Sequence, residues 1–418
     1  MSAREENTNP GECESRLQRL LALIGDWRLI APAVFLVLLE DFLETWIYGA
    51  FMLEKHSYAS NIRKNVSIIE NSSVQANALI LGTSVAYQGL NVGLLNAELE
   101  RRQTGIVTQS AACEGCMLQT QHMLYRMLKD RWPDMNTVVH IADTTLSSKA
   151  RYEYDVANGS MMAQFDRGTA LELLELHEFK LGYREYLYFY LRLATYQQDL
   201  RAFVLDPFRR IRTIGERLRE PHREYTHTND NLYSYGAFSA SGDLRACANN
   251  AAAGIDDSGQ PVPEKQDGED FNSQIHRTDR HHRNAVRVTC HIADLEKNHV
   301  PAGENQWRDL YFRRLEKMYA EIYADGRRVV TIIPPYSDLI LHANTDRRIA
   351  RWRERIAGMA AEHGREYAFI DMRRSIGSFD QPVGRKYFYD VLHLNTDGAK
   401  TWTRRVAEHL PAARELIL

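Results

Sequence analysis

The chain has 418 residues, enough for two or three domains of about 150 residues or for one large α/β domain with insertions. Its 52 Lys and Arg against 55 Asp and Glu give a formal charge of -3, and 44% of its residues are hydrophobic. This balance excludes collagen-like, wholly disordered and disulfide-scaffold proteins. It also lacks the excess of Lys and Arg that is typical of proteins that bind nucleic acid. The mean hydropathy of -0.44 excludes a multi-span membrane protein but leaves room for one spanning segment.

The first 28 residues are a polar tail, and a largely apolar segment follows them. Residues 29–53 are long enough to cross a bilayer with some tilt, although Glu40, Asp41 and Glu44 interrupt them. A secretory signal peptide is disfavoured because no small-residue cleavage site follows the apolar run. We expect a single transmembrane or membrane-associated helix, with a buried amphipathic helix of the folded domain as the alternative. Residues 54–75 are expected to be a linker.

From residue 76 the chain alternates between apolar strand patterns and helical patterns. Continuous apolar strands separated by helices predict a parallel sheet that is covered on both faces. The sequence therefore predicts a doubly wound α/β domain over residues 76–418. The expected strands are Ala78–Leu81, Thr104–Gln109, Thr137–Ala142, Arg328–Ile333 and Tyr367–Asp371, and the expected helices are Val92–Glu100, Leu118–Leu128, Trp307–Tyr323, Asp346–His363 and Ala399–Leu410.

An insertion at about residues 147–303 separates the third strand from the fourth and is too long for a simple loop. Its first half, Thr169–Arg219, is helical in pattern. Its second half, Pro221–Pro301, is rich in Gly, Asp, Asn and His, so we expect an exposed, partly mobile elaboration. An aromatic run in the first half is typical of a core helix, with carbohydrate stacking as the alternative. The run comprises Tyr183, Tyr186, Tyr188, Phe189 and Tyr190.

The five cysteines are too few and too widely spaced for a small fold that disulfides hold together. Their odd number leaves at least one cysteine unpaired within the chain. Cys113 and Cys116 form the one close pair, and no second pair stands at zinc-ligand spacing. Cys290-His291 and the Arg-His-His-Arg run at 280–283 are weak hints only, so we expect no metal and no cofactor. In an oxidising compartment, a Cys113–Cys116 bridge and a Cys247–Cys290 bridge are both compatible with the sequence.

Candidate catalytic residues stand after the expected strands, where parallel sheets gather their ligands. Ser84 lies at a strand-to-helix turn and needs a base to act as a nucleophile. His393 can take its proton, and Asp390, three residues earlier, can fix the imidazole tautomer. The backbone amides of Ser84 and Gly115 are candidates for binding a developing oxyanion. The alternative is structural: cap positions for Ser84 and Asp390, a helix-flanking position for His393 and a turn glycine at Gly115.

Other nucleophile and nucleotide motifs are absent from the sequence. An α/β-hydrolase elbow needs Gly-x-Ser-x-Gly, and Ala86 replaces its second glycine. The strings of a P-loop and of a dinucleotide-binding fold are missing as well. The serine-based constellation is therefore the leading hypothesis.

These residues resemble the SGNH/GDSL hydrolase superfamily over about residues 76–145 and 305–410, which implies a flavodoxin-like, three-layer αβα fold. Gly82-Thr83-Ser84 matches the first block, with Thr where Asp is usual, Gly115 stands at the second block, and Asp390-Val391-Leu392-His393 matches the last. The third block departs from the family, because Ala142-Asp143-Thr144 stands where an Asn supplies the oxyanion hole. An ionised Asp143 would repel an oxyanion, so the expected donor is Thr144, or this donor is missing.

The N-terminal segment, the Leu-Gly-Thr-Ser strand end, the long insertion and the Pro-Pro-Tyr at 334–336 are similar to a membrane-anchored subgroup. That subgroup includes the alginate O-acetylation proteins and the D-alanyl transfer protein of the teichoic-acid pathway. The resemblance implies a single-pass protein of the cell inner membrane with a periplasmic domain. It also implies O-acyl transfer, in the first place O-acetyl transfer, to an extracytoplasmic polysaccharide or cell-envelope glycan, with a membrane-bound O-acyltransferase as partner. The alternatives are a carbohydrate esterase or deacetylase of the same fold and a non-catalytic assembly or polymer-binding protein.

Overall fold

The chain divides into two compact units, and the larger one contains the sheet. The smaller unit consists of Met1–Ser57 and Tyr190–Glu220, and the larger of Tyr58–Phe189 and Pro221–Leu418. The computed structural model describes residues 27–43, 58–143, 156–176, 181–212, 244–255, 259–262, 280–298, 305–337, 343–365, 367–376 and 387–415.

The core of the larger unit is a five-stranded parallel sheet with the strand order β2-β1-β3-β4-β5. The strands β1 and β3 are buried along their whole length and pair in register, with Leu79 opposite Val138. The predicted α/β class and parallel sheet are confirmed. The strands are β1 (Ala78–Gly82), β2 (Thr108–Ser110), β3 (Thr137–Ile141), β4 (Arg328–Ile333) and β5 (Ala368–Asp371).

The strand β2 begins later than the sequence pattern predicts. Gly105 has a φ of 65°, and the Thr104 N–H and hydroxyl both donate to the Leu99 carbonyl. These contacts close the end of the preceding helix, so residues 104–107 turn the chain instead of extending the strand. Only the last part of the apolar run is left to pair with β1.

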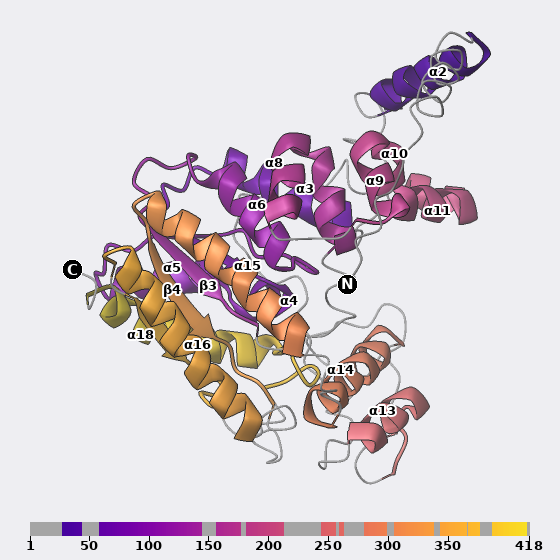
Figure 1. The fold of residues 1–418 in the computed structure, drawn as a ribbon. Coiled ribbons are helices and arrows are strands. Elements are labelled where there is room, and N and C mark those ends of the chain that lie inside the picture. The colour runs from indigo at the N-terminus through magenta and orange to yellow at the C-terminus, as the bar shows by residue number, and fades with distance from the viewer. Residues whose placement is uncertain are drawn as a thin grey trace, which may run out of the picture. The chain divides into compact units, whose positions relative to one another are not determined.

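Two rows of helices cover the sheet (Figure 1). In one row, α18 contacts both α4 and α5; in the other, α15 contacts both α6 and α16. Right-handed crossovers between parallel strands place these rows on opposite faces. The unit is thus a three-layer α/β structure. The helices are α4 (Ser84–Gly89), α5 (Val92–Arg101), α6 (Leu118–Leu128), α15 (Asn305–Ala324), α16 (Ala343–Glu362) and α18 (Thr396–Glu415).

The strand order reverses between β1 and β3, because β2 lies on one side of β1 and the later strands lie on the other. At such a switch point the loops that follow the two central strands leave toward opposite faces, and a crevice opens at the carboxyl edge. Ser84 follows β1 and Asp143 follows β3. The fold therefore places the candidate residues at the edge where ligands bind in sheets of this type.

A helix, α3 (Tyr58–Asn71), occupies most of the segment that we expected to be a linker. Its Ile62 and Ile69 side chains are fully buried, and the Asn65 amide donates to the Ala112 carbonyl over 2.8 Å. The α3 helix therefore belongs to the larger unit, where it supports the loop after β2.

The insertion contains several helices, and two of them lie in the second half, where we expected an exposed, partly mobile elaboration. In that half the structure describes α13 (Leu244–Ala253) and α14 (Arg280–Asn298). Val286, Cys290 and Ala293 recur at helical spacing on one buried face of α14. The expectation of an exposed elaboration is therefore wrong for this one face of α14, which a short apolar stripe buries, whereas residues on the other face, such as Val288 and His291, are exposed. The first half contains α8 (Arg167–Leu176), α9 (Tyr183–Tyr190), α10 (Arg192–Thr195) and α11 (Gln197–Leu205).

The aromatic run on α9 divides between the interior and the surface. Tyr188 and Phe189 are buried, as a core helix requires. Tyr183, Tyr186 and Tyr190 are exposed. The core interpretation therefore holds for two of the five aromatic side chains.

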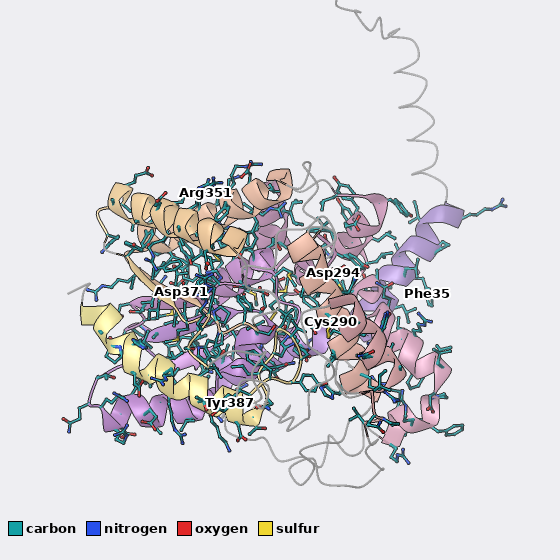
Figure 2. The ribbon with its side chains drawn as sticks, turned by 90° about the horizontal axis from the view of Figure 1, so that it is seen from below. Phe35, Cys290, Asp294, Arg351, Asp371 and Tyr387 are labelled. Carbon is teal, nitrogen blue, oxygen red and sulfur yellow. A yellow bond between two sulfur atoms is a disulfide. The ribbon has the colours of Figure 1, made fainter. Side chains whose placement is uncertain are left out.

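The apolar N-terminal segment is helical where the structure describes it, over α2 (Trp27–Leu43), with Pro32 inside the helix. Within the described ranges, no helix has both the length and the apolar character needed to cross a membrane. The rest of the expected spanning segment, including Glu44, lies outside the described residues. Among the α2 side chains whose placement the structure describes, most of the large apolar ones are exposed, Phe35 among them (Figure 2), and Glu40 is buried.

Two disulfides join the cysteine pairs that the sequence allowed. Cys113 and Cys116 are bridged with their Cα atoms 5.3 Å apart, and Cys247 and Cys290 with theirs 6.2 Å apart. Both separations lie in the usual range for disulfides. The second bridge ties α13 to α14, and the fifth cysteine, Cys13, lies outside the described residues.

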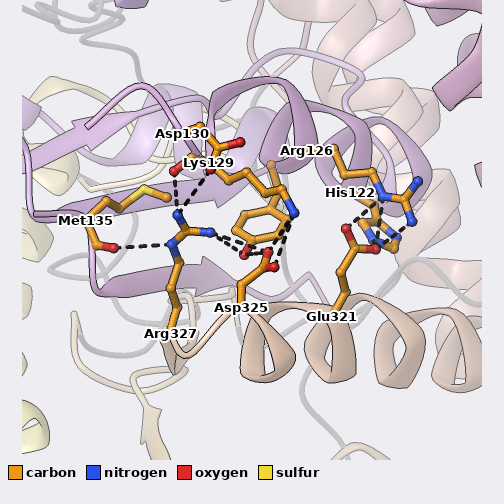
Figure 3. Close-up of polar contacts among 9 residues, drawn as sticks. His122, Arg126, Lys129, Asp130, Met135, Glu321, Asp325 and Arg327 are labelled. Carbon is orange, nitrogen blue, oxygen red and sulfur yellow. Dashed lines mark hydrogen bonds and ion pairs between the residues drawn. The ribbon is translucent and has the colours of Figure 1, made fainter. Parts of the chain in front are cut away.

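A polar network joins α6 to α15 (Figure 3). The Glu321 carboxylate accepts from the His122 ring over 2.8 Å and from the Arg126 guanidinium over 2.8 Å. Burial opposes ionisation of Glu321, but these two donors outweigh it and lower the pKa of Glu321 to about 2. Burial lowers the pKa of His122 despite the nearby carboxylate, so its ring is a neutral donor.

A second set of contacts continues the network at the C-terminal ends of the same two helices (Figure 3). The Tyr125 hydroxyl donates to Asp325 over 2.6 Å, and Lys129 pairs with the same carboxylate. Arg327 donates to the Tyr125 oxygen and to the Lys129 carbonyl. The layer between α6 and α15 is therefore fixed by directed polar contacts as well as by apolar packing.

Candidate active site

Ser84 is the first residue of α4 and follows β1 after a single intervening residue. Thr83 is the N-cap of α4, and its hydroxyl accepts from the Val85 N–H. Thr is among the side chains that cap helices well, which explains why the chain turns here from strand to helix. The turn places Ser84 at the positive end of the α4 backbone, on the carboxyl edge of the sheet.

Asp390 and His393 lie on a short hairpin that leads into α18. Phe388 and Leu394 form an antiparallel bridge, and the Tyr389 N–H donates to the His393 carbonyl over 2.9 Å. One oxygen of the buried Asp390 carboxylate accepts from the backbone N–H of both Leu392 and His393, each over 2.8 Å. The Asp-x-x-His spacing thus builds a turn that carries its own internal hydrogen bonds.

The side chains of the three predicted residues are joined by two successive hydrogen bonds and form an array. The Ser84 Oγ lies 2.9 Å from His393 Nε2, and His393 Nδ1 lies 2.8 Å from Asp390 Oδ2. The carboxylate can only accept, so Nδ1 carries a proton and Nε2 is left to accept from the serine hydroxyl. This is the arrangement of nucleophile, base and orienting acid that acyl-transfer sites use.

The electrostatics of the site favour protonation of His393. Burial would lower the pKa of His393, but the charge and hydrogen bond of Asp390 outweigh it and raise that pKa above its usual value of 6.5. Glu114 and Asp143 add to the rise. An imidazole in this position can take the serine proton and later return it to a leaving group.

Gly115 lies on the loop that follows β2, as predicted. Its φ of 73° is a left-handed conformation that a glycine adopts without strain. The Cys113 N–H donates to the Gly82 carbonyl, which ties this loop to the end of β1. Among the described residues, the backbone N–H groups of Gly115 and Ser84 donate to no protein acceptor in the hydrogen bonds observed, which leaves both available to an oxyanion.

The residues of the expected third block are only partly described. Asp143 follows β3 and is buried, and its Oδ1 accepts from the Tyr336 hydroxyl over 2.9 Å. Tyr336 follows β4, so the hydrogen bond links the ends of two neighbouring strands. Thr144, the expected donor, lies outside the described residues.

Four residues contribute to the site although the sequence did not place them in it. Gln88, one turn after Ser84, donates to the Glu114 carboxylate over 2.9 Å. The only signal in the sequence for this contact was that Glu114 is the neighbour of Gly115. His282 and Thr289 reach the Asp390 hairpin from α14, and the apolar spacing of that helix was the signal available for its burial.

His282 lies at the histidine-rich start of α14 and is used for hydrogen bonding. His282 contacts the Tyr389 carbonyl, and Cys290 is bonded to Cys247. In the part of the chain that is described, no group of three His, Cys, Asp or Glu side chains is placed to hold a metal ion.

Comparison with known proteins gives no family assignment. No protein-family model matches the chain, and no curated protein matches it in sequence. The geometry of the Ser84, His393 and Asp390 array is therefore the basis for assigning a function to the chain.

Proposed function

We propose that the chain is a membrane-anchored, SGNH-like O-acyltransferase that forms an acyl-enzyme on Ser84. The observation that carries the proposal is the hydrogen-bonded array of Ser84, His393 and Asp390 at the switch point of a parallel sheet. The order β2-β1-β3-β4-β5 is the flavodoxin-like order expected for this superfamily. If Ser84 and Asp390 served only as cap residues and His393 only flanked a helix, nothing would require their side chains to be joined by successive hydrogen bonds.

The first half-reaction follows from the array. The Ser84 Oγ attacks the carbonyl carbon of an acyl ester while His393 Nε2 takes the hydroxyl proton. The carbonyl oxygen gains negative charge, which the N–H groups of Ser84 and Gly115 can bind. His393 then donates the proton to the departing alcohol oxygen, the ester bond breaks, and the acyl group remains on Ser84.

The second half-reaction determines the class of enzyme. In a transferase, a sugar hydroxyl gives its proton to His393 and attacks the acyl-serine carbonyl. The bond between Ser84 Oγ and the acyl carbon then breaks, His393 returns the proton to Ser84 Oγ, and the acyl group remains on the glycan. In a carbohydrate esterase or deacetylase, water takes the place of that hydroxyl. We infer O-acetyl transfer to an extracytoplasmic polysaccharide or cell-envelope glycan, with a membrane-bound O-acyltransferase as the partner that supplies acyl groups.

The site of action that we propose is the periplasmic face of the inner membrane, with residues 29–53 as the single anchor. The exposed apolar side chains of α2 support this placement, since such a cluster is costly in water. The two disulfides favour an oxidising compartment. Deletion of residues 1–53 should release the protein from membranes, and unchanged fractionation would refute the anchor.

A non-catalytic assembly or polymer-binding protein is the second candidate, and Asp143 favours it. Its carboxylate stands where the superfamily uses an amide donor, and it already accepts from Tyr336. A carboxylate cannot donate to an oxyanion while it is ionised. Under this alternative the three residues keep their arrangement, but the protein catalyses no reaction.

Labelling with a fluorophosphonate probe separates the two candidates. Attack on the probe phosphorus needs an activated serine, so the wild type should be labelled and Ser84→Ala should not. Ser72→Ala is the matched control, because Ser72 is also part-buried but contacts Gln109 in place of a histidine. No labelling of the folded wild type would favour the non-catalytic candidate. Mass spectrometry of oligosaccharides incubated with an acetyl ester then distinguishes transfer from hydrolysis.

A further inference from the structure

The hairpin that carries Asp390 and His393 is braced from outside by the insertion helix α14. The His282 Nε2 lies 2.6 Å from the Tyr389 carbonyl oxygen, and the Thr289 hydroxyl oxygen accepts from the Val391 N–H over 3.3 Å. These two contacts flank Asp390 in the sequence. Both bind the hairpin backbone, so they act on the position of the turn itself.

The two contacting residues lie on one face of α14. They are seven positions apart, which is about two helical turns and about 10 Å along the axis. Both side chains are buried, and Val286 and Cys290 fill the same face. Figure 2 shows Cys290 and Asp294 one turn apart on this helix. The Cys247–Cys290 disulfide joins the helix to α13.

His282 contacts Tyr389 in two ways, through a hydrogen bond and through ring stacking. Its ring stacks on the Tyr389 ring at a centroid distance of 4.4 Å and an interplanar angle of 24°. A carbonyl oxygen only accepts, so His282 Nε2 must carry a proton in this contact. A hydrogen bond and a ring stack on the same residue hold Tyr389 in one orientation more firmly than either does alone.

The internal hydrogen bonds of the hairpin do not by themselves set its distance from Ser84. They fix His393 relative to Asp390, whereas Ser84 belongs to a different element, at the start of α4. The α14 contacts supply a support from outside the hairpin. A serine and its base need an oxygen–nitrogen distance near 3 Å, and a shift of about 1 Å can cost about 10²-fold in rate.

We propose that His282 and Thr289 of the insertion are positioning residues, which hold the Asp390 and His393 hairpin at bonding distance from Ser84. This inference depends on the proposed function for its catalytic consequence. It assigns the second half of the insertion a role in the site: α14 is the outer support of the base, and the disulfide to α13 fastens that support.

The test compares substitutions at two histidines of α14 in the full-length protein. His282→Phe keeps an aromatic ring for stacking but removes the donor, and His282→Gln keeps a donor without the ring. His291→Phe is the matched control, because His291 is exposed on the same helix. Each variant is measured for its thermal midpoint, for fluorophosphonate labelling and for kcat and KM on p-nitrophenyl acetate, at a temperature where all are folded.

We expect His282→Phe to lower kcat and the labelling rate by about 10²-fold with little change in KM, and His282→Gln to recover part of the loss. His291→Phe should behave as the wild type. A purely structural role would lower the thermal midpoint without changing kcat, and that result would overturn the proposal.

Hydrogen exchange of the hairpin amides gives a readout that does not need catalysis. In His282→Phe the amides of residues 389–393 should exchange faster than in the wild type and in His291→Phe. Unchanged exchange would show that α14 does not hold the hairpin, even if labelling fails in every variant. Absence of labelling in the wild type together with faster exchange in His282→Phe would reject the proposed function and retain the contact.

Discussion

Ser84 Oγ and His393 Nε2 lie 2.9 Å apart, although 309 positions separate the two residues in the chain. The first residue follows β1, and the second stands just before the last described helix, α18. The parallel sheet brings these two parts of the larger unit to one edge. The intervening residues complete the sheet and supply a helix that supports the base.

Asp390→Asn tests the orientation of the histidine ring. The asparagine carbonyl can still accept from the Leu392 and His393 N–H groups, so the turn should survive. Its amide would then donate to His393 Nδ1, which moves the ring proton to Nε2 and leaves no acceptor for the serine hydroxyl. We expect the fluorophosphonate labelling rate to fall about 10²–10⁴-fold with an unchanged thermal midpoint.

A labelling rate close to wild type in Asp390→Asn would show that the ring proton is not controlled by this contact. Asp397→Asn is a suitable control, since Asp397 is an exposed carboxylate only four residues after His393. It should label at the wild-type rate.

Local sequence patterns carried most of the information needed for the sheet and the array. Apolar runs locate strands because both faces of a parallel sheet are buried, and the Asp-x-x-His turn is closed by contacts within four residues. The contribution of α14 was not predictable in this way. His282 and Thr289 are polar side chains whose burial depends on backbone partners more than 100 positions away, at Tyr389 and Val391.

Glu114→Gln tests the charge around the base. Glu114 raises the pKa of His393 together with Asp390 and Asp143. The base must be neutral to accept the serine proton, so the labelling rate falls as the pH drops through that pKa. Removing the Glu114 charge lowers the pKa of His393, and the acidic limb of the pH profile should therefore move to lower pH.

The measurement is the labelling rate constant as a function of pH for the wild type, Glu114→Gln and a control. Glu354→Gln removes a charge from an exposed position on α16 and should leave the limb in place. A limb that stays fixed in Glu114→Gln, or moves to higher pH, would mean that Glu114 does not interact with the charged form of His393.

Gly398→Ala tests the junction between the hairpin and α18. An added Cβ would collide with the Tyr387 carbonyl, which also accepts from the Asn395 N–H. Either the hairpin or the start of α18 must move, so the labelling rate should fall and the free energy of unfolding should drop by about 1–3 kcal/mol.

The comparison variant for this junction is Gly358→Ala. A Cβ at Gly358, within α16, would meet nothing within 4 Å. Because alanine is the better helix former, this variant should gain about 0.5–1 kcal/mol in denaturant unfolding. If Gly398→Ala matches the wild type in both labelling and stability, the close approach at Tyr387 is not a constraint on the hairpin.

Glu321→Gln tests the network between α6 and α15 through its pH dependence (Figure 3). The pKa of Glu321 is lowered from 4.5 to about 2, because the donors His122 and Arg126 outweigh burial. A carboxylate with a depressed folded-state pKa stabilises the protein above the unfolded-state value and loses that contribution as the pH falls toward the folded-state value. The stabilisation from Glu321 should therefore be complete above about pH 4.5 and disappear toward about pH 2.

In Glu321→Gln the charge is gone at every pH, so two differences from the wild type follow. Near neutral pH the free energy of unfolding should be lower by about 1–3 kcal/mol, the usual range for hydrogen bonds to charged groups. As the pH falls below about 4.5, the free energy of unfolding should decrease less in the variant than in the wild type. Plots of this free energy against pH, measured by urea denaturation, should therefore converge for the two proteins. Glu316→Gln on the same helix is the control: its partly exposed pair with Arg355 should contribute about 0–1 kcal/mol. If the plots of unfolding free energy against pH stay parallel for Glu321→Gln and the wild type down to pH values near 2, His122 and Arg126 do not hold Glu321 ionised.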